Sequence, residues 1–275
     1  MLAVKVDNTA KAQPQVGVDA ADVVYVEEVE GGLTRLAAVF STSYPKAVGP
    51  VRSARISDIQ LLRQYGSVGL VYSGSQRAMV APLERSDLTL LSLDAGSRGF
   101  RRAADRPAPY NVIADLGVLR QRAGDGVSTP TAVGYRFGPA PTGGRAASSA
   151  TVRWPAARLR ATWSSAQRRW LVAMGDRPSR TPGGRQLGPT TLVVQRVDVV
   201  ASPYRDVNRN VTPDSRTVGS GTALVLRDGR VYDARWARPS DAAPTSYTIG
   251  GRPAVFAAGQ VWVALVGASR EVTVR

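Results

Sequence analysis

The stretch that decides the fold is ADVVYVEEVEGGLTRLAAVF, residues 21–40. Apolar and β-branched residues stand on both sides of a glycine pair at 31–32, and two glycines tolerate the positive φ angles of a tight turn. The pattern therefore predicts a β-hairpin closed by this pair.

A two-residue turn would also set the pairing of the hairpin. It places Glu28 opposite Arg35, so Glu28, Glu30 and Arg35 are expected to share one strand face. The other face is expected to point to the core; it carries Val23, Tyr25, Leu36 and Phe40.

The segment that follows the hairpin is GPVRSAR, residues 49–55, just before a helix expected within residues 53–66. Arg52 and Arg55 would then stand at a helix N-terminus, which carries partial positive charge and favours anions. In one interpretation both arginines pair with Glu28 and Glu30 of the hairpin. In the other they bind a phosphate or carboxylate, with Ser53 as a possible helix cap. The two interpretations can hold together.

Polar residues at expected strand ends add further candidates. LAVKVDN, residues 2–8, alternates like an edge or half-buried strand, and its last residues Asp7 and Asn8 are typical of an Asx turn. YSGSQ, residues 72–76, carries Ser73 and Ser75 in a loop that we expect at the same end of the sheet as GPVRSAR. It matches neither a nucleophile elbow nor a phosphate-binding loop.

The composition changes near residue 140, and all five Trp lie beyond that point. We expect an α/β N-terminal domain over 1–140, a Gly/Pro/Ser-rich linker over 141–150 and a β-rich C-terminal domain over 151–275. The predicted fold class is α+β, with a mixed α/β sheet in the N-terminal part packed with the β-rich module. Two separate domains and two lobes that share a sheet both fit the pattern.

The absence of Cys and His narrows the possible chemistry. It excludes disulfides, thiol catalysis, Ser-His-Asp triads and Cys/His zinc sites. The formal net charge of +15 comes mostly from Arg, which a GC-rich genome favours in any protein, but part of it still suggests an anionic partner. No apolar run approaches the ~20 residues of a membrane span, and the start does not read as a signal peptide.

One possible metal site also fails on inspection. DVNRNVTPDSRT, residues 206–217, begins like a calcium loop, but Val211 stands where Gly is needed and Thr217 where a bidentate Glu is needed. We therefore expect a turn there, and no metal or cofactor.

Several segments, in this order, resemble the YerB-like family of bacterial extracytoplasmic lipoproteins: AVKVDN, ADVVYVEEVEGGLTRLAAVF, GPVRSAR, PAPYN, GSGTALVLRDGRVYDARW and AAGQVWVAL. The resemblance implies an α+β fold with a β-rich C-terminal module, and it implies no established activity. Its lipoprotein signal with an anchoring Cys is lacking here, which suggests a trimmed or non-lipidated form. In PAPYN, Tyr110 stands where members of the family often have His, so a mechanism that needs this His does not carry over.

The sequence therefore predicts a YerB-like extracytoplasmic protein, membrane-anchored in its full-length form, that binds in the cell envelope without catalysis. Its Arg-lined pocket would accept the anionic or carboxylate group of an envelope polymer, a peptide or a protein. The candidate binding residues are Asp7, Asn8, Glu28, Glu30, Thr34, Arg35, Arg52, Ser53, Arg55, Ser73, Ser75 and Asn111.

Two alternatives remain open at this point. One is a carboxylate-dependent hydrolase of glycans or phosphodiesters, with Glu30 or Glu28 as acid/base. The other is a nucleic-acid-binding protein that uses the Arg excess, with Trp and Arg side chains stacked on bases. Trp residues at strand spacing are more often core residues, which is the interpretation we favour.

Overall fold

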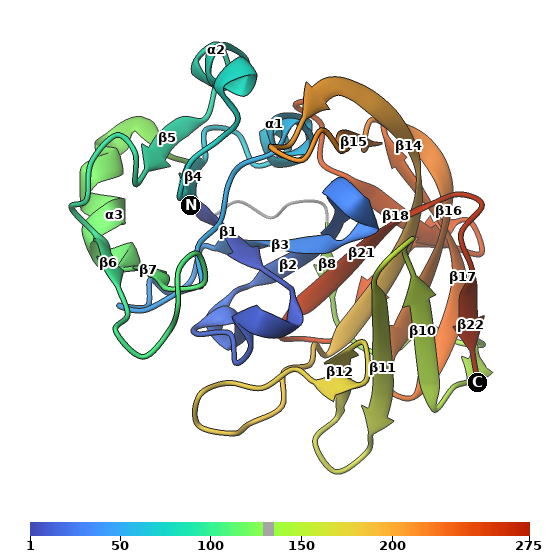
Figure 1. The fold of residues 1–275 in the computed structure, drawn as a ribbon. Helices are drawn as coiled ribbons and strands as arrows, with labels where there is room; N and C mark the ends of the chain where they lie inside the picture. The colour runs from blue at the N-terminus through green and yellow to red at the C-terminus, as the bar shows by residue number, and fades with distance from the viewer. Residues whose placement is uncertain (129–134) are drawn as a thin grey trace.

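A computed structural model describes residues 1–128 and 135–275 (Figure 1). Its main feature is a 13-stranded sheet. In order across the sheet, the strands are β19 (Arg252–Pro253), β18 (Ser246–Ile249), β17 (Arg230–Arg238), β16 (Gly219–Arg227), β14 (Thr191–Arg205), β21 (Val261–Gly267), β2 (Val23–Glu28), β3 (Thr34–Phe40), β1 (Leu2–Asp7), β4 (Gly69–Tyr72) and β5 (Thr89–Ser92). Two further strands pair at its side: β15 (Val211–Arg216) with β14, and β9 (Arg145–Ala146) with β17.

The parallel pair β2–β21 joins the N-terminal and C-terminal strands, with Val23 opposite Val261. Strands from both sides of residue 140 therefore belong to one sheet, while the domain boundaries themselves stay a prediction. Residues 141–150 are not a plain linker, because β9 pairs there with β17 and β10 (Ser149–Arg153) begins there. The Gly/Pro/Ser-rich composition did not predict these short strands, because they form through backbone hydrogen bonds and need no particular side chains.

Both faces of the large sheet are covered (Figure 1). A five-stranded sheet packs on one face through residues such as Trp170 and Leu159, and its order is β13 (Arg177–Pro178), β12 (Arg169–Met174), β11 (Arg158–Ser164), β10 and β22 (Val272–Val274). Helix α3 (Leu116–Ala123) lies on the same side. Helices α1 (Ile56–Arg63) and α2 (Val80–Glu84) contribute to the core on the other face. The remaining strands form two small pairs: β6 (Phe100–Arg102) with β7 (Val112–Ala114), and β8 (Arg136–Phe137) with β20 (Val255–Phe256).

The mixed sheet and the β-rich C-terminal part confirm the α+β prediction. Helix α3 begins after Asp115, which caps it by accepting the N–H of Val118 at 3.1 Å. Trp154, Trp170, Trp236 and Trp262 are buried, which confirms them as core residues. None of the helices in residues 1–128 and 135–275 has the length and apolar character needed to cross a bilayer.

Strand β1 differs from the prediction of an edge or half-buried strand. It lies between β3 and β4, and all six of its residues are buried, Lys5 and Asp7 among them. Alternate residues of β1 point to opposite faces of the sheet, and both faces are buried here. One of these faces carries the polar side chains of Lys5 and Asp7.

The register of the β2–β3 hairpin is also shifted by one residue from the prediction. A single 3₁₀ turn, η3 (Glu30–Gly32), lengthens the loop, and the N–H of Val29 donates to the carbonyl of Leu33 at 2.8 Å. Glu27 therefore opposes Arg35, and Glu28 opposes Thr34. A shift of one residue moves each side chain to the other face. Tyr25 and Val23 consequently lie in a different core layer from Leu36 and Phe40.

The two glycines of this turn are expected to differ sharply in tolerance. Both have positive φ, 66° at Gly31 and 69° at Gly32. A Cβ on Gly31 would meet nothing within 4 Å, whereas a Cβ on Gly32 would lie 2.4 Å from Cβ of Pro155. Gly31→Ala should therefore cost about 1–2 kcal/mol of backbone strain. Gly32→Ala should cost about 2–4 kcal/mol, because overpacking adds to the strain. Urea unfolding of both variants tests this, and equal costs would contradict the close packing at Pro155.

Candidate functional site

The GPVRSAR segment is held between the end of β1 and the loop after β4. The N–H of Arg52 donates to the carbonyl of Lys5 at 2.8 Å, and the N–H of Ser73 donates to the carbonyl of Arg52 at 3.0 Å. The N–H of Ala54 donates to the carbonyl of Gly74, also at 3.0 Å. The structure thus brings the loop with Ser73 and Ser75 to the same end of the sheet as GPVRSAR.

The unfavourable charge at the start of helix α1 is balanced from inside the helix. Arg55 is the N-cap residue, and its N–H donates to Oδ2 of Asp58 at 2.6 Å, so a carboxylate lies in the first turn. Ser53 does not cap the helix, contrary to expectation. Its carbonyl accepts from Nη1 of Arg35 at 3.5 Å and from Nη1 of Arg55 at 3.3 Å instead.

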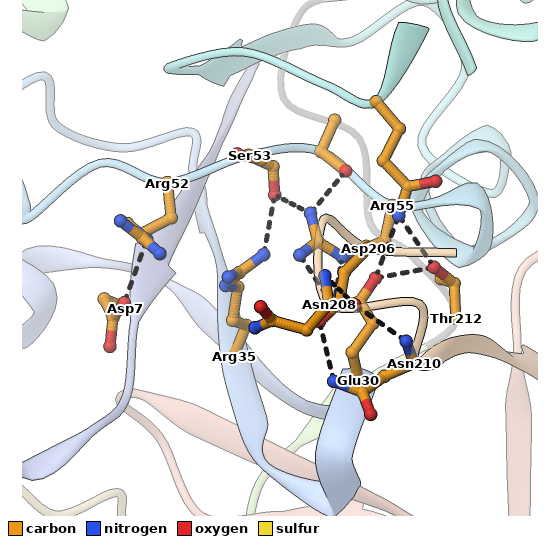
Figure 2. Close-up of polar contacts among 12 residues, drawn as sticks. Asp7, Glu30, Arg35, Arg52, Ser53, Arg55, Asp206, Asn208, Asn210 and Thr212 are labelled. Carbon is orange, nitrogen blue, oxygen red and sulfur yellow. Dashed lines mark hydrogen bonds and ion pairs between the residues drawn. The ribbon is translucent and has the colours of Figure 1, made fainter. Parts of the chain in front are cut away.

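Arg55 and Glu30 form a buried ion pair (Figure 2). Nε and Nη2 of Arg55 both donate to Oε2 of Glu30, at 2.9 and 2.7 Å. The hydroxyl of Thr212 on β15 donates to Oε1 at 2.6 Å. Burial alone would raise the pKa of Glu30, but the Arg55 charge and these hydrogen bonds outweigh burial and hold the pKa below its usual range. The predicted Arg–Glu pairing is therefore correct for this pair.

Arg52 pairs with Asp7 rather than with a hairpin glutamate (Figure 2). Its Nε lies 3.0 Å from Oδ2 of Asp7, at an angle that does not make a hydrogen bond, and its guanidinium lies 5.6 Å from the ring centre of Tyr110. Oδ1 of Asp7 accepts from the N–H of Thr9 at 2.7 Å, which is the predicted Asx turn. Asp7 thus both closes its strand and neutralises Arg52.

Arg35 is the arginine left over. It lies in register with Glu27 on β2 and Asp7 on β1, yet within the described residues it forms no ion pair within 4.0 Å. Among the described residues, its guanidinium makes a single hydrogen bond, the long contact of 3.5 Å to the carbonyl of Ser53. Burial, together with the neighbouring charges of Arg55 and Arg52, lowers the pKa of Arg35 to about 10. The guanidinium therefore lacks a full anionic partner (Figure 2).

Beneath this cluster lies a charged group that the sequence did not reveal. Nζ of Lys5 lies 2.7 Å from Oε1 of Glu27 and 2.6 Å from Oδ1 of Asp58, and all three side chains are at most 1% exposed. Burial raises the pKa of Glu27 to about 7, although Lys5 opposes this shift. A Lys inside an otherwise apolar strand was the available signal, since a buried ammonium needs carboxylate partners.

A hollow of about 330 Å³ opens beside Arg52. Arg52, Ser53, Ser73, Ser75 and Arg102 line it together with Asp94, which makes no ion pair within the described part of the chain. Arg102 donates from Nη1 to the amide oxygen of Asn111 at 3.0 Å. Asn111 is thus linked to the hollow through Arg102 and is not among the residues that line it.

Other candidate residues lie elsewhere. Thr34 and Asn8 are buried, Nδ2 of Asn8 donates to the Thr34 hydroxyl at 2.9 Å, and both residues line a separate hollow of about 440 Å³. Glu28 is wrong as a partner of Arg52 or Arg55: the register shift turns it to the opposite face, where it lines a separate groove with Arg270.

The loop at residues 206–210 is a turn, as predicted. The carboxylate of Asp206 accepts from the N–H groups of Asn208 and Asn210 at 2.9 and 2.8 Å. In Figure 2 this turn lies beside Arg55 and Glu30. Residues 1–128 and 135–275 contain no group of three or more potential His, Cys, Asp or Glu metal ligands.

The geometry disfavours Glu30 as a general acid. An acid catalyst near neutral pH needs a raised pKa and access to substrate, whereas Glu30 has a lowered pKa and is 6% exposed. Glu28 has a raised pKa caused by burial, and Asp198 and Arg270 line the same groove.

Comparisons with known proteins agree with this architecture. The N-terminal domain model of "Protein of unknown function (DUF3048)" matches residues 1–128, and the corresponding C-terminal domain model matches residues 150–263. The Bacillus subtilis (strain 168) protein named "Putative lipoprotein YerB" is 33% identical over 123 residues. That alignment spans 44% of this chain and only 37% of the relative.

A solved structure extends the likeness to almost the whole chain. The crystal structure of YerB protein from Bacillus subtilis superposes with a TM-score of 0.81 and 19% sequence identity. The match covers 99% of this chain and 93% of that chain. At this identity the match establishes the fold.

Proposed function

Because the chain belongs to the YerB-like DUF3048 family, we propose that it is an extracytoplasmic protein of the cell envelope that binds an anionic group without catalysis. The relative's name describes a lipoprotein, which supports a place outside the cytoplasm and a membrane anchor in the full-length protein. The ligand group is a carboxylate or phosphate of an envelope polymer, a peptide or a protein partner.

The observation that carries the proposal is the unpaired guanidinium of Arg35. Its neighbours Arg52 and Arg55 each have a carboxylate partner, at 3.0 and 2.7 Å, and Arg35 has none within the described residues. Ser53 connects it to the hollow, because the Ser53 carbonyl accepts from Arg35 and Ser53 also lines that space. An anion in the hollow would meet Arg52 and Arg102, with the charge of Arg35 behind them, and these three cations would oppose the single carboxylate of Asp94 in the lining.

The distribution of charge within the polar cluster is more important for anion binding than its net charge. The polar cluster balances four cationic side chains with four carboxylates: Lys5, Arg35, Arg52 and Arg55 with Asp7, Glu27, Glu30 and Asp58. The excess negative charge is buried around Lys5, and the excess positive charge is on the half-buried Arg35. This separation makes the Arg35 side attractive to an anion even though the whole cluster is neutral.

The nucleic-acid alternative has less support. Non-specific binding of single strands depends on aromatic side chains on which bases stack. Trp154, Trp170, Trp236 and Trp262 are each at most 4% exposed, so these four offer no stacking platform.

The test replaces Arg35 with Met. A side chain kept for binding should be dispensable for folding, and the lowered pKa of Arg35 indicates that its charge is unfavourable in the folded protein. We expect the free energy of unfolding of Arg35→Met, measured in urea, to lie no more than about 1 kcal/mol below that of the parent or to exceed it. We also expect citrate and inorganic phosphate to bind at least about tenfold more weakly, as measured by calorimetry.

Arg252→Met is the matched control. Arg252 is exposed on β19 and makes no ion pair among the described residues, so its loss removes the same charge away from the hollow. If Arg35→Met destabilises the protein by several kcal/mol, Arg35 is structural. If the parent does not bind either anion, or if the control loses affinity equally, the proposed site is wrong.

A further inference from the structure

The five-stranded sheet carries a second polar hollow, separate from the Arg35 cluster. It has a volume of about 470 Å³ and lies on the outer face of strands β10, β11, β12 and β22. The inner face of the same sheet is apolar, with Ala150, Val152, Leu159 and Trp170 packed in the core. The strands thus alternate between a buried apolar side and an open side of Thr, Ser and Arg.

The strand register arranges the open side in rows across the sheet. The middle row runs from Thr273 through Thr151 and Arg160 to Ala173 and Pro178. On one side of it lies a row with Ser149, Thr162 and Leu171. The middle row, in which Arg160 is the one long side chain, forms the floor of a trough that crosses five strands, a length of about 19 Å at 4.8 Å per strand spacing.

The arginines of the trough differ in how well they are neutralised. Arg153 is paired with Glu271 at 3.2 Å, and Arg158 with Asp176, so that rim is balanced. Arg160 on the floor is exposed and has no ion pair or side-chain hydrogen bond among the described residues. The hydroxyls of Thr151 and Thr162 likewise have no partner within the described part of the chain. The trough therefore presents a free cation among free hydroxyls.

These features together indicate one ligand class. Free hydroxyls that both donate and accept suit the hydroxyls of a sugar, and the free guanidinium suits a carboxylate or phosphate. None of the described residues that line the trough is aromatic, so the trough offers no ring on which nucleic-acid bases could stack. A shallow trough does not enclose a small ligand, but a long chain can make contacts along its whole length. We infer that this trough binds an extended, linear anionic polysaccharide.

The test measures binding of galacturonate oligomers of increasing length by calorimetry, with dextran oligomers as the neutral counterpart and polyphosphate as charge without sugar. Affinity for galacturonate should rise with length until the trough is spanned, and dextran should bind far more weakly. Arg160→Ala should weaken galacturonate binding about tenfold. Arg235→Ala, at an exposed position of β17 outside this hollow, should leave binding unchanged.

A second variant keeps the test independent of charge. Ala173→Trp fills the floor of the trough and should also abolish binding, while thermal unfolding checks that the fold is retained. No binding of long oligomers to the parent, or full binding by Arg160→Ala, would overturn the inference. Polyphosphate and a single-stranded dT20 oligonucleotide carry charge without this sugar chain. If either binds as tightly as galacturonate or more tightly, and Arg160→Ala weakens that binding, the ligand class is not a saccharide. Loss of binding in Arg35→Met with retention in Arg160→Ala would assign the polymer to the first hollow instead.

Discussion

Replacing Lys5 with Met is expected to lower the free energy of unfolding by about 3–5 kcal/mol. Lys5 is fully buried and is the cation that Glu27 and Asp58 share at 2.7 and 2.6 Å. Without it, two carboxylates remain in the interior with no positive partner, and breaking a buried pair costs more than the pair contributes. Urea unfolding at pH 7 measures the difference.

The Lys5 prediction has an internal control and a characteristic pH dependence. Glu27→Gln should cost less than about 1.5 kcal/mol, because Lys5 and Asp58 remain as a one-to-one pair. The double variant Lys5→Met, Glu27→Gln should recover part of the loss. Lys5 opposes the rise that burial causes in the pKa of Glu27, so in Lys5→Met the folded-state pKa of Glu27 should lie further above its unfolded value. A raised carboxyl pKa favours the folded state at low pH and this effect is lost as the pH rises, so the variant should be less impaired at pH 5 than at pH 8.

A Lys5→Met protein as stable as the parent at pH 8 would contradict this account. Such a result would mean that water or another cation reaches the two carboxylates. The side chains of Lys5, Glu27 and Asp58 are at most 1% exposed and offer no contact to a substrate, so we expect this charged group to be structural.

Replacing Arg55 with Met is expected to cost a similar amount, about 3–5 kcal/mol at pH 7. Glu30 would keep the hydrogen bond from Thr212 at 2.6 Å but would lose both donors to Oε2. The turn of the β2–β3 hairpin, the start of helix α1 and strand β15 meet at this pair, so its loss should loosen all three together. Chemical unfolding of the single variants Arg55→Met and Glu30→Gln and of the double variant gives the coupling energy.

The pH dependence of this pair has the opposite sign. The pKa of Glu30 is lowered on folding, so its pairing stabilises the protein above the unfolded value of about 4.3 and this contribution is lost as the pH falls through the folded value. The gap between the parent and Arg55→Met should therefore shrink below about pH 4. A gap that stays constant down to pH 2.5 would show that Arg55 acts through packing alone.

Local pattern was sufficient for much of this protein. The Asx turn at Asp7 and the turn at residues 206–210 were both predicted, because each follows from contacts a few residues apart. The Arg55–Glu30 pair was also predicted, because both residues lie next to turns that are close in sequence. The order of segments was sufficient to indicate the family and with it the fold class.

The positions of charges in the interior required the tertiary structure. A 3₁₀ turn at Glu30–Gly32, stabilised where Gly32 meets Pro155, moved the hairpin register by one residue and exchanged the roles of Glu27 and Glu28. Strand β1 became a central strand because β4 pairs with its residues 2–4 and the GPVRSAR segment pairs beside its residues 5–7, where Lys5 and Asp7 are buried.

The sequence by itself determined the β2–β3 hairpin, the place of its EGG turn and the place of the GPVRSAR arginines before a helix, because these depend on backbone preferences and neighbouring residues. Only the tertiary structure decided which arginine has no carboxylate partner among residues 1–128 and 135–275. That outcome depends on pairing between strands far apart in the chain: β1 supplies Asp7 to Arg52, the η3 turn supplies Glu30 to Arg55, and Arg35 between them is left without one.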